Sequence, residues 1–160
     1  TSELRRYLKQ FLSDPRVVEV PRLIWWLILN LIILRIRPRR SAKLYESVWT
    51  EGGSPLLVYS QAQVDGVKKL LDEKYDSDIP VVLGMRYGNP SIESAINDLT
   101  EQNVREITIL PLYPQYSGAT TGSTFDAVAD VFKKTRWVPQ LNFVGGYPVR
   151  GIFGCALRFY

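Results

Sequence analysis

The stretch Glu106-Ile-Thr-Ile-Leu-Pro-Leu112 decides the fold class of this 160-residue chain. It is a short apolar run of strand length, and a helical pattern lies on either side of it. Two further runs of the same kind are Val81–Tyr87 and Leu141–Val144. Because strands alternate with helices, we predict an α/β fold, built on a parallel sheet with right-handed crossovers and helices on both faces.

Four segments carry a helical pattern. They are a stretch from Ser2 that Asp14-Pro15 closes, Ser60–Tyr75, Ser91–Asn103 and a stretch that begins at Ser123 after a polar loop. The turn Gly52-Gly53-Ser54-Pro55 is expected to cap the segment that follows it. Pro90 is expected at the first helical position of the third helix.

The chain has no histidine and one cysteine, Cys155. It therefore has no Ser-His-Asp triad, no histidine general base and no histidine metal ligand. One cysteine excludes an internal disulfide, a cysteine-rich zinc site and an iron–sulfur cluster held by this chain alone. The chemistry must use Arg, Tyr, Ser, Asp, Glu and backbone groups, or residues that the chain lacks.

Positive charge gathers at the front of the chain. Residues 1–50 contain ten Lys/Arg and four Asp/Glu, whereas residues 51–160 contain ten and twelve. This distribution favours a local anionic partner, and the absence of a recognised nucleic-acid motif argues against nucleic acid. No secretory signal pattern opens the chain, so we expect a cytoplasmic location.

The apolar run Leu23–Leu34 contains Trp25 and Trp26 and is followed by a basic cluster up to Lys43. A spanning helix needs about 20 apolar residues, so this run is too short to cross a bilayer. Paired indoles and nearby cations suit a membrane surface, but a run that is apolar on all sides suits a buried helix equally well. The residues alone leave both interpretations open.

Ligands of parallel sheets bind beyond the carboxyl ends of the strands, and two loops fall there. They are Met85–Ser91 and Leu110–Ser123, and neither contains a dinucleotide or triphosphate motif. Arg86 would offer a charged fork to a carboxylate, whereas a surface ion pair with an aspartate is the plainer alternative. Rings for a flat ligand would come from Tyr87, Tyr113 and Tyr116, which also suit a core. Helix caps are the simple interpretation of Thr120, Thr121 and Ser123. Together these residues favour a planar anionic ligand.

Four motifs resemble the ferrochelatase family, in its bacterial, proteobacterial-like branch. They are Tyr7-Leu-Lys-Gln-Phe-Leu-Ser-Asp14, Glu51-Gly-Gly-Ser-Pro-Leu56, Met85-Arg-Tyr-Gly-Asn-Pro-Ser91 and Leu110-Pro-Leu-Tyr-Pro-Gln-Tyr-Ser117. The resemblance covers residues 3–147 and about the N-terminal half of a typical member. It implies the first of two similar Rossmann-like domains, here without its usual first strand and without the second domain.

The resemblance implies an enzyme, a lyase that inserts ferrous iron into protoporphyrin IX to form protohaem, the last step of haem biosynthesis. Iron is a substrate, and no organic cofactor is needed. The residues that match the family's porphyrin-binding positions are Tyr45, Ser54, Met85, Arg86, Tyr87 and Tyr113. Arg39 and Arg40 would lie on the propionate side. Trp25 and Trp26 would belong to a lip at the cleft mouth, which favours a peripheral contact with the inner face of the cytoplasmic membrane.

The chain departs from the family pattern in three ways. The family's catalytic histidine and its partner glutamate would lie beyond residue 160, so we expect this chain to be inactive alone. Gly118 stands where many members have a cluster-binding cysteine, so no iron–sulfur cluster is expected. Residues 148–160 do not resemble the family, and a frameshift or an artificial end accounts for this more simply than divergence. The alternative function is a non-catalytic porphyrin-binding or peripheral membrane-binding module.

Overall fold

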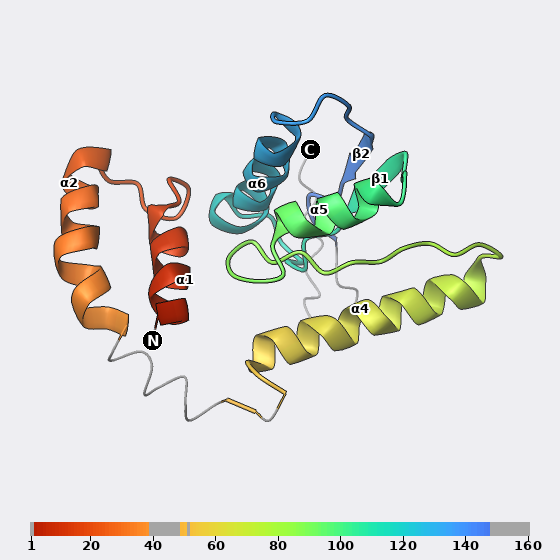
Figure 1. Cartoon of the computed structure of the whole chain (residues 1–160), viewed down its shortest axis with the longest axis horizontal. Coiled ribbons are helices and arrows are strands. Elements are labelled where there is room, and N and C mark those ends of the chain that lie inside the picture. The colour runs from red at the N-terminus through yellow and green to blue at the C-terminus, as the bar shows by residue number, and fades with distance from the viewer. Residues whose placement is uncertain (1, 39–48, 51, 148–160) are drawn as a thin grey trace. The chain divides into compact units, whose positions relative to one another are not determined.

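The computed structural model describes residues 2–38, 49–50 and 52–147. The chain divides into two compact units, Thr1–Asn103 and Val104–Tyr160. Figure 1 identifies the helices and strands of both units by label and colour. Each unit is described by itself.

The first unit begins with two helices that pack against each other. They are α1 (Ser2–Ser13) and α2 (Arg22–Ile28), and α2 continues into a π-helical turn, η1 (Leu29–Ile33) (Figure 1, red and orange). Buried leucines form the contact: Leu8 and Leu12 of α1, with Leu29 and Leu34. The predicted helix from Ser2 to the Asp14-Pro15 stop is confirmed. Its leucines recur at helical spacing and bury one stripe against a neighbour.

The long helix α4 (Pro55–Lys74) begins five residues earlier than the sequence predicts. Its start follows from local chemistry: Ser54 is the N-cap, and its Oγ accepts a hydrogen bond from the N–H of Leu57 at 3.2 Å. Pro55 stands in the first turn, where its missing N–H costs nothing. Gly53 has a φ of +111°, which favours glycine. The predicted capping turn is confirmed.

The predicted strand Val81–Tyr87 is wrong. Only Met85 pairs there, in an isolated parallel bridge with Ser91, and its N–H donates to the carbonyl oxygen of Pro90 at 2.7 Å. An apolar run becomes a strand only where a second strand takes its backbone hydrogen bonds. Among the described residues, the two regular strands both belong to the other unit. The segment therefore runs as an extended loop.

Helix α5 (Ile92–Glu101) starts at Ser91, which is its N-cap. The Oγ of Ser91 accepts from the N–H of Ser94 at 3.0 Å. Pro90 therefore lies before the cap and not at the first helical position, which corrects the prediction. The apolar positions Ile92, Ala95, Ile96 and Leu99 are buried and make the helix amphipathic.

The second unit contains the sheet. Strands β1 (Glu106–Ile109) and β2 (Gln140–Phe143) are parallel, with Ile107 opposite Leu141. Between them the chain forms a π-helical turn, η2 (Gly118–Gly122), and helix α6 (Ser123–Phe132) (Figure 1). This β–α–β order confirms the predicted α/β class, with two strands found among the described residues.

The helical segment of the second unit starts earlier than predicted. Because η2 already begins at Gly118, Thr120 and Thr121 lie inside η2, and Ser123 is the first residue of α6, whose N-cap is Gly122. Thr121 and Ser123 are fully buried, and the Oγ1 of Thr120 donates to the carbonyl oxygen of Ser117 at 3.3 Å. None of these three residues is the N-cap of η2 or α6, so the predicted cap position is wrong. Strand β1 also stops at Ile109, two residues before Pro111, which has no N–H to give to a sheet.

The described part of the chain has neither a membrane-spanning helix nor a cluster of metal ligands. None of its helices combines the length and the apolar character that crossing a membrane requires. Nor do three or more His, Cys, Asp or Glu side chains gather there in a way that would hold a metal ion.

Candidate functional site

The carboxylate of Asp14 lies at the centre of a polar cluster in the described part of the first unit. Its side chain is 2% exposed. Its Oδ2 accepts hydrogen bonds from Nη2 of Arg86 at 2.6 Å and from the hydroxyl of Tyr87 at 2.8 Å. Its Oδ1 accepts from the backbone N–H of Arg16 at 2.8 Å. Both carboxylate oxygens are therefore engaged, two of the bonds joining α1 to a loop more than 70 residues away.

The turn after α1 explains how Asp14 reaches this position. Its backbone carbonyl oxygen accepts from the N–H groups of Val17 and Val18, at 3.1 and 3.0 Å. Pro15 follows directly and prevents α1 from continuing. Main chain and side chain of Asp14 thus both take part in the turn, which directs the carboxylate toward the 85–88 loop.

Aromatic rings complete the cluster on the α1 side. Tyr7 and Phe11 are stacked, with ring centroids 6.2 Å apart and planes 7° from parallel. Each meets Tyr87 edge-on, at centroid distances of 6.3 and 5.3 Å. Edge-to-face contacts of this kind are favourable beyond the area they bury. They hold the Tyr87 ring in one orientation.

Two further contacts fix the loop itself. The Cζ of Arg86 lies 4.6 Å from the centroid of the Tyr87 ring, so the guanidinium is held between that ring and the Asp14 carboxylate. The N–H of Gly88, whose φ is +89°, donates to Oε1 of Gln10 at 3.1 Å. The loop is therefore attached to α1 through both side chains and backbone.

The structure brings together three of the predicted site residues, Met85, Arg86 and Tyr87, on this loop. Arg86 forms an ion pair with an aspartate, as the plainer of the two interpretations predicts. Since 26% of its side chain stays exposed, contact with a ligand carboxylate remains open as well. Asp14 was not singled out from the sequence, nor were Tyr7 and Phe11. The signal was present, because all three belong to the Tyr7–Asp14 motif that resembles the family.

The remaining predicted contacts divide into described and undescribed residues. Ser54 is half-buried, and its Oγ serves as the α4 cap. Tyr113 and Tyr116, in the second unit, are 41% and 66% exposed. Their loop is held by a hydrogen bond from the N–H of Tyr147 to the carbonyl oxygen of Pro114 at 3.1 Å. Arg39, Arg40 and Tyr45 lie outside the described residues.

The two tryptophans of α2 lie in different environments. Trp25 is half-buried in the α1–α2 contact, and its Nε1–H donates to the carbonyl oxygen of Leu12 at 2.6 Å. Trp26 is 61% exposed. The apolar residues exposed beside it in this segment are Leu23, Ile24, Leu27, Ile28, Leu31, Ile32 and Ile36. The run is therefore core on one face and an exposed apolar surface on the other.

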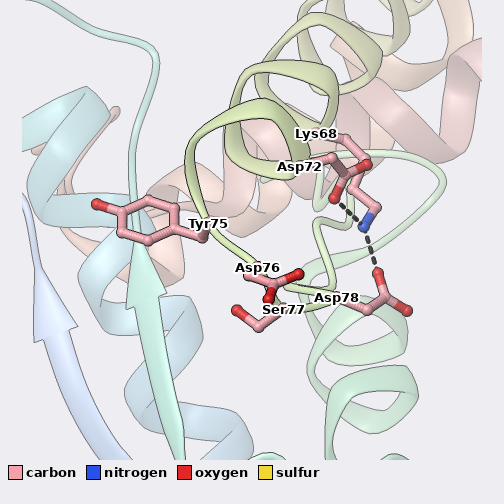
Figure 2. Close-up of a pocket in the computed structure, with 6 residues that line it drawn as sticks. All are labelled: Lys68, Asp72, Tyr75, Asp76, Ser77 and Asp78. Carbon is pink, nitrogen blue, oxygen red and sulfur yellow. Dashed lines mark hydrogen bonds and ion pairs between the residues drawn. The ribbon is translucent and has the colours of Figure 1, made fainter.

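A separate hollow lies at the end of α4 (Figure 2). Lys68 Nζ bridges Asp72, at 2.7 Å, and Asp78, while Tyr75 points away from this bridge. The hydrogen bonds that the Lys68 ammonium donates to Asp72 and then to Asp78 raise the pKa of Lys68. The hollow contains none of the predicted site residues, and its ion pairs link the helix to the turn that follows it.

The parallel β1–α6–β2 unit defines an α/β protein. Its candidate site is the loop cluster around Asp14. Comparison with known proteins then gives the family. The chain belongs to the ferrochelatase family, whose model, described as Ferrochelatase, matches residues 1–157.

Curated relatives agree with this assignment. The chain is 60% identical to the ferrochelatase of Alcanivorax borkumensis, over 92% of this chain and 43% of that protein. It is 62% identical to the ferrochelatase of Thioalkalivibrio sulfidiphilus, over 90% of this chain and 39% of that protein. For the ferrochelatase of Pseudoalteromonas atlantica the values are 56%, 90% and 40%. The chain thus spans about two-fifths of the length of these relatives.

Proposed function

We propose that this chain is part of a ferrochelatase, which inserts ferrous iron into protoporphyrin IX in haem biosynthesis, and that it supplies one wall of the porphyrin cleft. Family membership supports the reaction. The Asp14–Arg86–Tyr87 cluster supports the wall, because it holds an aromatic ring and a cation rigidly on one loop. This cluster is the observation that carries the assignment of the site.

The reaction explains why rigidity matters. Ferrous iron enters the ring and the two inner N–H groups each lose a proton, so the products are protohaem and two protons. The ring must be distorted to turn its nitrogen lone pairs toward the metal, and binding energy is spent on that distortion. A wall whose ring and guanidinium are fixed by several contacts resists being deformed by the substrate instead.

We propose that Met85, Arg86, Tyr87 and Tyr113 face the macrocycle, and that Ser54, Tyr45 and the pair Arg39 and Arg40 lie toward its carboxylates. The exposure of Tyr113 and the partial exposure of Arg86 support contact with a ligand. Because no histidine occurs in this chain, we propose that its residues bind and orient the porphyrin while proton removal takes place elsewhere. The chain alone then turns over no substrate.

We further propose that the protein works without an organic cofactor and without an iron–sulfur cluster, iron being a substrate. Gly118 is the first residue of η2 and has no side chain to offer a cluster. The one cysteine of the chain is Cys155. A cluster needs several thiolate ligands.

We also propose that the protein is cytoplasmic and makes a peripheral contact with the inner face of the cytoplasmic membrane. The outer face of α2 and η1 supports it, since it exposes Trp26 among leucines and isoleucines. Arg22, Arg35 and Arg37 are exposed around this face. An apolar face bordered by cations suits the boundary between acyl chains and anionic headgroups.

Titration of the 160-residue chain with protoporphyrin IX, followed by porphyrin fluorescence, tests the proposed site. We expect saturable binding that weakens in Arg86→Ala and Tyr87→Ala. The variant Lys133→Ala is the control, because its ion pair with Asp130 lies exposed in the second unit. Binding that is unaffected by the two loop substitutions contradicts the assignment. Binding without iron insertion in any complete form of the protein favours the non-catalytic alternative.

A further inference from the structure

The burial of Asp14 gives this residue a role beyond ending a helix. Its carboxylate is 2% exposed, whereas the Arg86 side chain is 26% exposed. A charged group removed from water needs a partner with good geometry, and Arg86 provides it at 2.6 Å. The ion pair is therefore closed on its aspartate side and open to a ligand on its arginine side.

The same carboxylate oxygen also determines how Tyr87 lies. The Tyr87 hydroxyl donates to Oδ2 of Asp14, the oxygen that Arg86 contacts. With the hydroxyl held there and the ring edges against Tyr7 and Phe11, the Tyr87 ring keeps one plane. One buried atom thus orients two adjacent side chains of the 85–88 loop.

Charge neutralisation follows from the same geometry. The positive charge of Arg86 lies beside a buried negative charge, so the pair is neutral as a unit. A porphyrin carboxylate that bound Arg86 would have to compete with the buried carboxylate of Asp14 for the guanidinium, and weakening a buried ion pair is costly. The guanidinium plane and the Tyr87 ring remain suited to a flat ring.

Resting on the proposed function, we infer that Asp14 is a positioning residue for porphyrin: it orients Arg86 and Tyr87 and cancels the charge of Arg86. This part of the wall recognises the macrocycle itself and not its carboxylate groups.

The test compares two probes, protoporphyrin IX and its dimethyl ester, in which both carboxylates are masked. Affinities of the 160-residue chain and its variants are measured by fluorescence in the same detergent. Asp14→Asn keeps the shape but loses the charge. We expect it to weaken binding of the dimethyl ester about tenfold, as the loss of a charge-assisted hydrogen bond implies. Binding of the free acid should weaken by no more than that, because the uncancelled charge of Arg86 attracts carboxylates. Tyr87→Phe removes only one hydrogen bond. It should weaken binding of both porphyrins by the same factor, which is smaller than the factor for Asp14→Asn.

Two controls separate positioning from mere loss of stability. Leu8→Ala removes a buried contact of the same helix on its α2 side, so it should lower the unfolding temperature and leave both affinities unchanged. In the double variant Asp14→Asn with Tyr87→Phe, the fold-loss of affinity should be smaller than the product of the two single fold-losses. The reason is that both substitutions affect the same hydrogen bond, from the Tyr87 hydroxyl to Asp14. Should Asp14→Asn not fold, Tyr87→Phe carries the comparison between probes.

The outcomes are distinguishable. A loss of affinity for the ester that is at least as large as the loss for the free acid, with both affinities unchanged in Leu8→Ala, supports the role of Asp14. Unchanged affinity in Asp14→Asn and Tyr87→Phe, or a loss confined to the free acid, overturns it and leaves the proposed function standing. A chain that binds neither porphyrin overturns the proposed function itself, and the role of Asp14 with it.

Discussion

Asp14 and Arg86 are 72 positions apart in the chain, yet Oδ2 of one and Nη2 of the other lie 2.6 Å apart. The aspartate is buried and the arginine only partly so. This pair connects the first helix to the loop that carries the candidate porphyrin contacts. Its strength should therefore appear in both stability and ligand binding.

Asp14→Ala should destabilise the first unit by about 3 kcal/mol, the lower end of the range for a broken buried pair, because Arg86 keeps some access to water. Equilibrium unfolding in urea measures the change. Asp130→Ala, which breaks an exposed ion pair with Lys133, serves as the control and should change little. Equal effects of the two substitutions would show that Asp14 is not held as described.

Ser54 allows its structural and ligand roles to be separated. Ser54→Ala removes the α4 cap and should cost about 1 kcal/mol. Ser54→Asp keeps a capping oxygen, so stability should be retained while the added negative charge weakens binding of protoporphyrin IX but not of its dimethyl ester. Urea unfolding and fluorescence titration are the two measurements. A variant with intact stability and equal affinity for both porphyrins places Ser54 away from the carboxylates.

Trp25 and Trp26 should respond in opposite ways to substitution. Trp26→Ser removes an exposed indole and should weaken co-sedimentation with vesicles that contain anionic lipid, without a change in stability. Trp25→Phe loses the bond to the Leu12 carbonyl oxygen and should cost about 1 kcal/mol, with vesicle binding retained. If neither substitution affects vesicle binding, the exposed face of α2 does not contact the membrane.

The sequence alone predicted the elements that depend on local patterns. The parallel strands around Ile107 and Leu141, the cap at Ser54 and the stop at Asp14-Pro15 all follow from hydrophobic periodicity or from one hydrogen bond near in the chain. Such signals act over a few residues. They are visible without any knowledge of the fold.

Features that depend on distant partners were missed. Val81–Tyr87 has strand composition, but a strand also needs a neighbour, and no local pattern supplies that information. Asp14 resembled an ordinary helix stop because its partners, Arg86 and Tyr87, are more than 70 residues away. The hydroxyl residues near Gly118 resembled caps because a π-helical turn that includes Thr120 and Thr121 leaves no simple sequence signal.

The most direct test of the central claim joins this chain to a complete relative. Residues 1–147 replace the corresponding part of the Alcanivorax borkumensis ferrochelatase, which is 60% identical, and insertion of ferrous iron into protoporphyrin IX is followed by absorbance. We predict that the chimera forms protohaem and that it loses activity when Arg86 and Tyr87 are both replaced by Ala. A folded chimera that binds porphyrin but forms no protohaem would contradict the account. So would a chimera whose activity is unchanged when Arg86 and Tyr87 are both replaced by Ala.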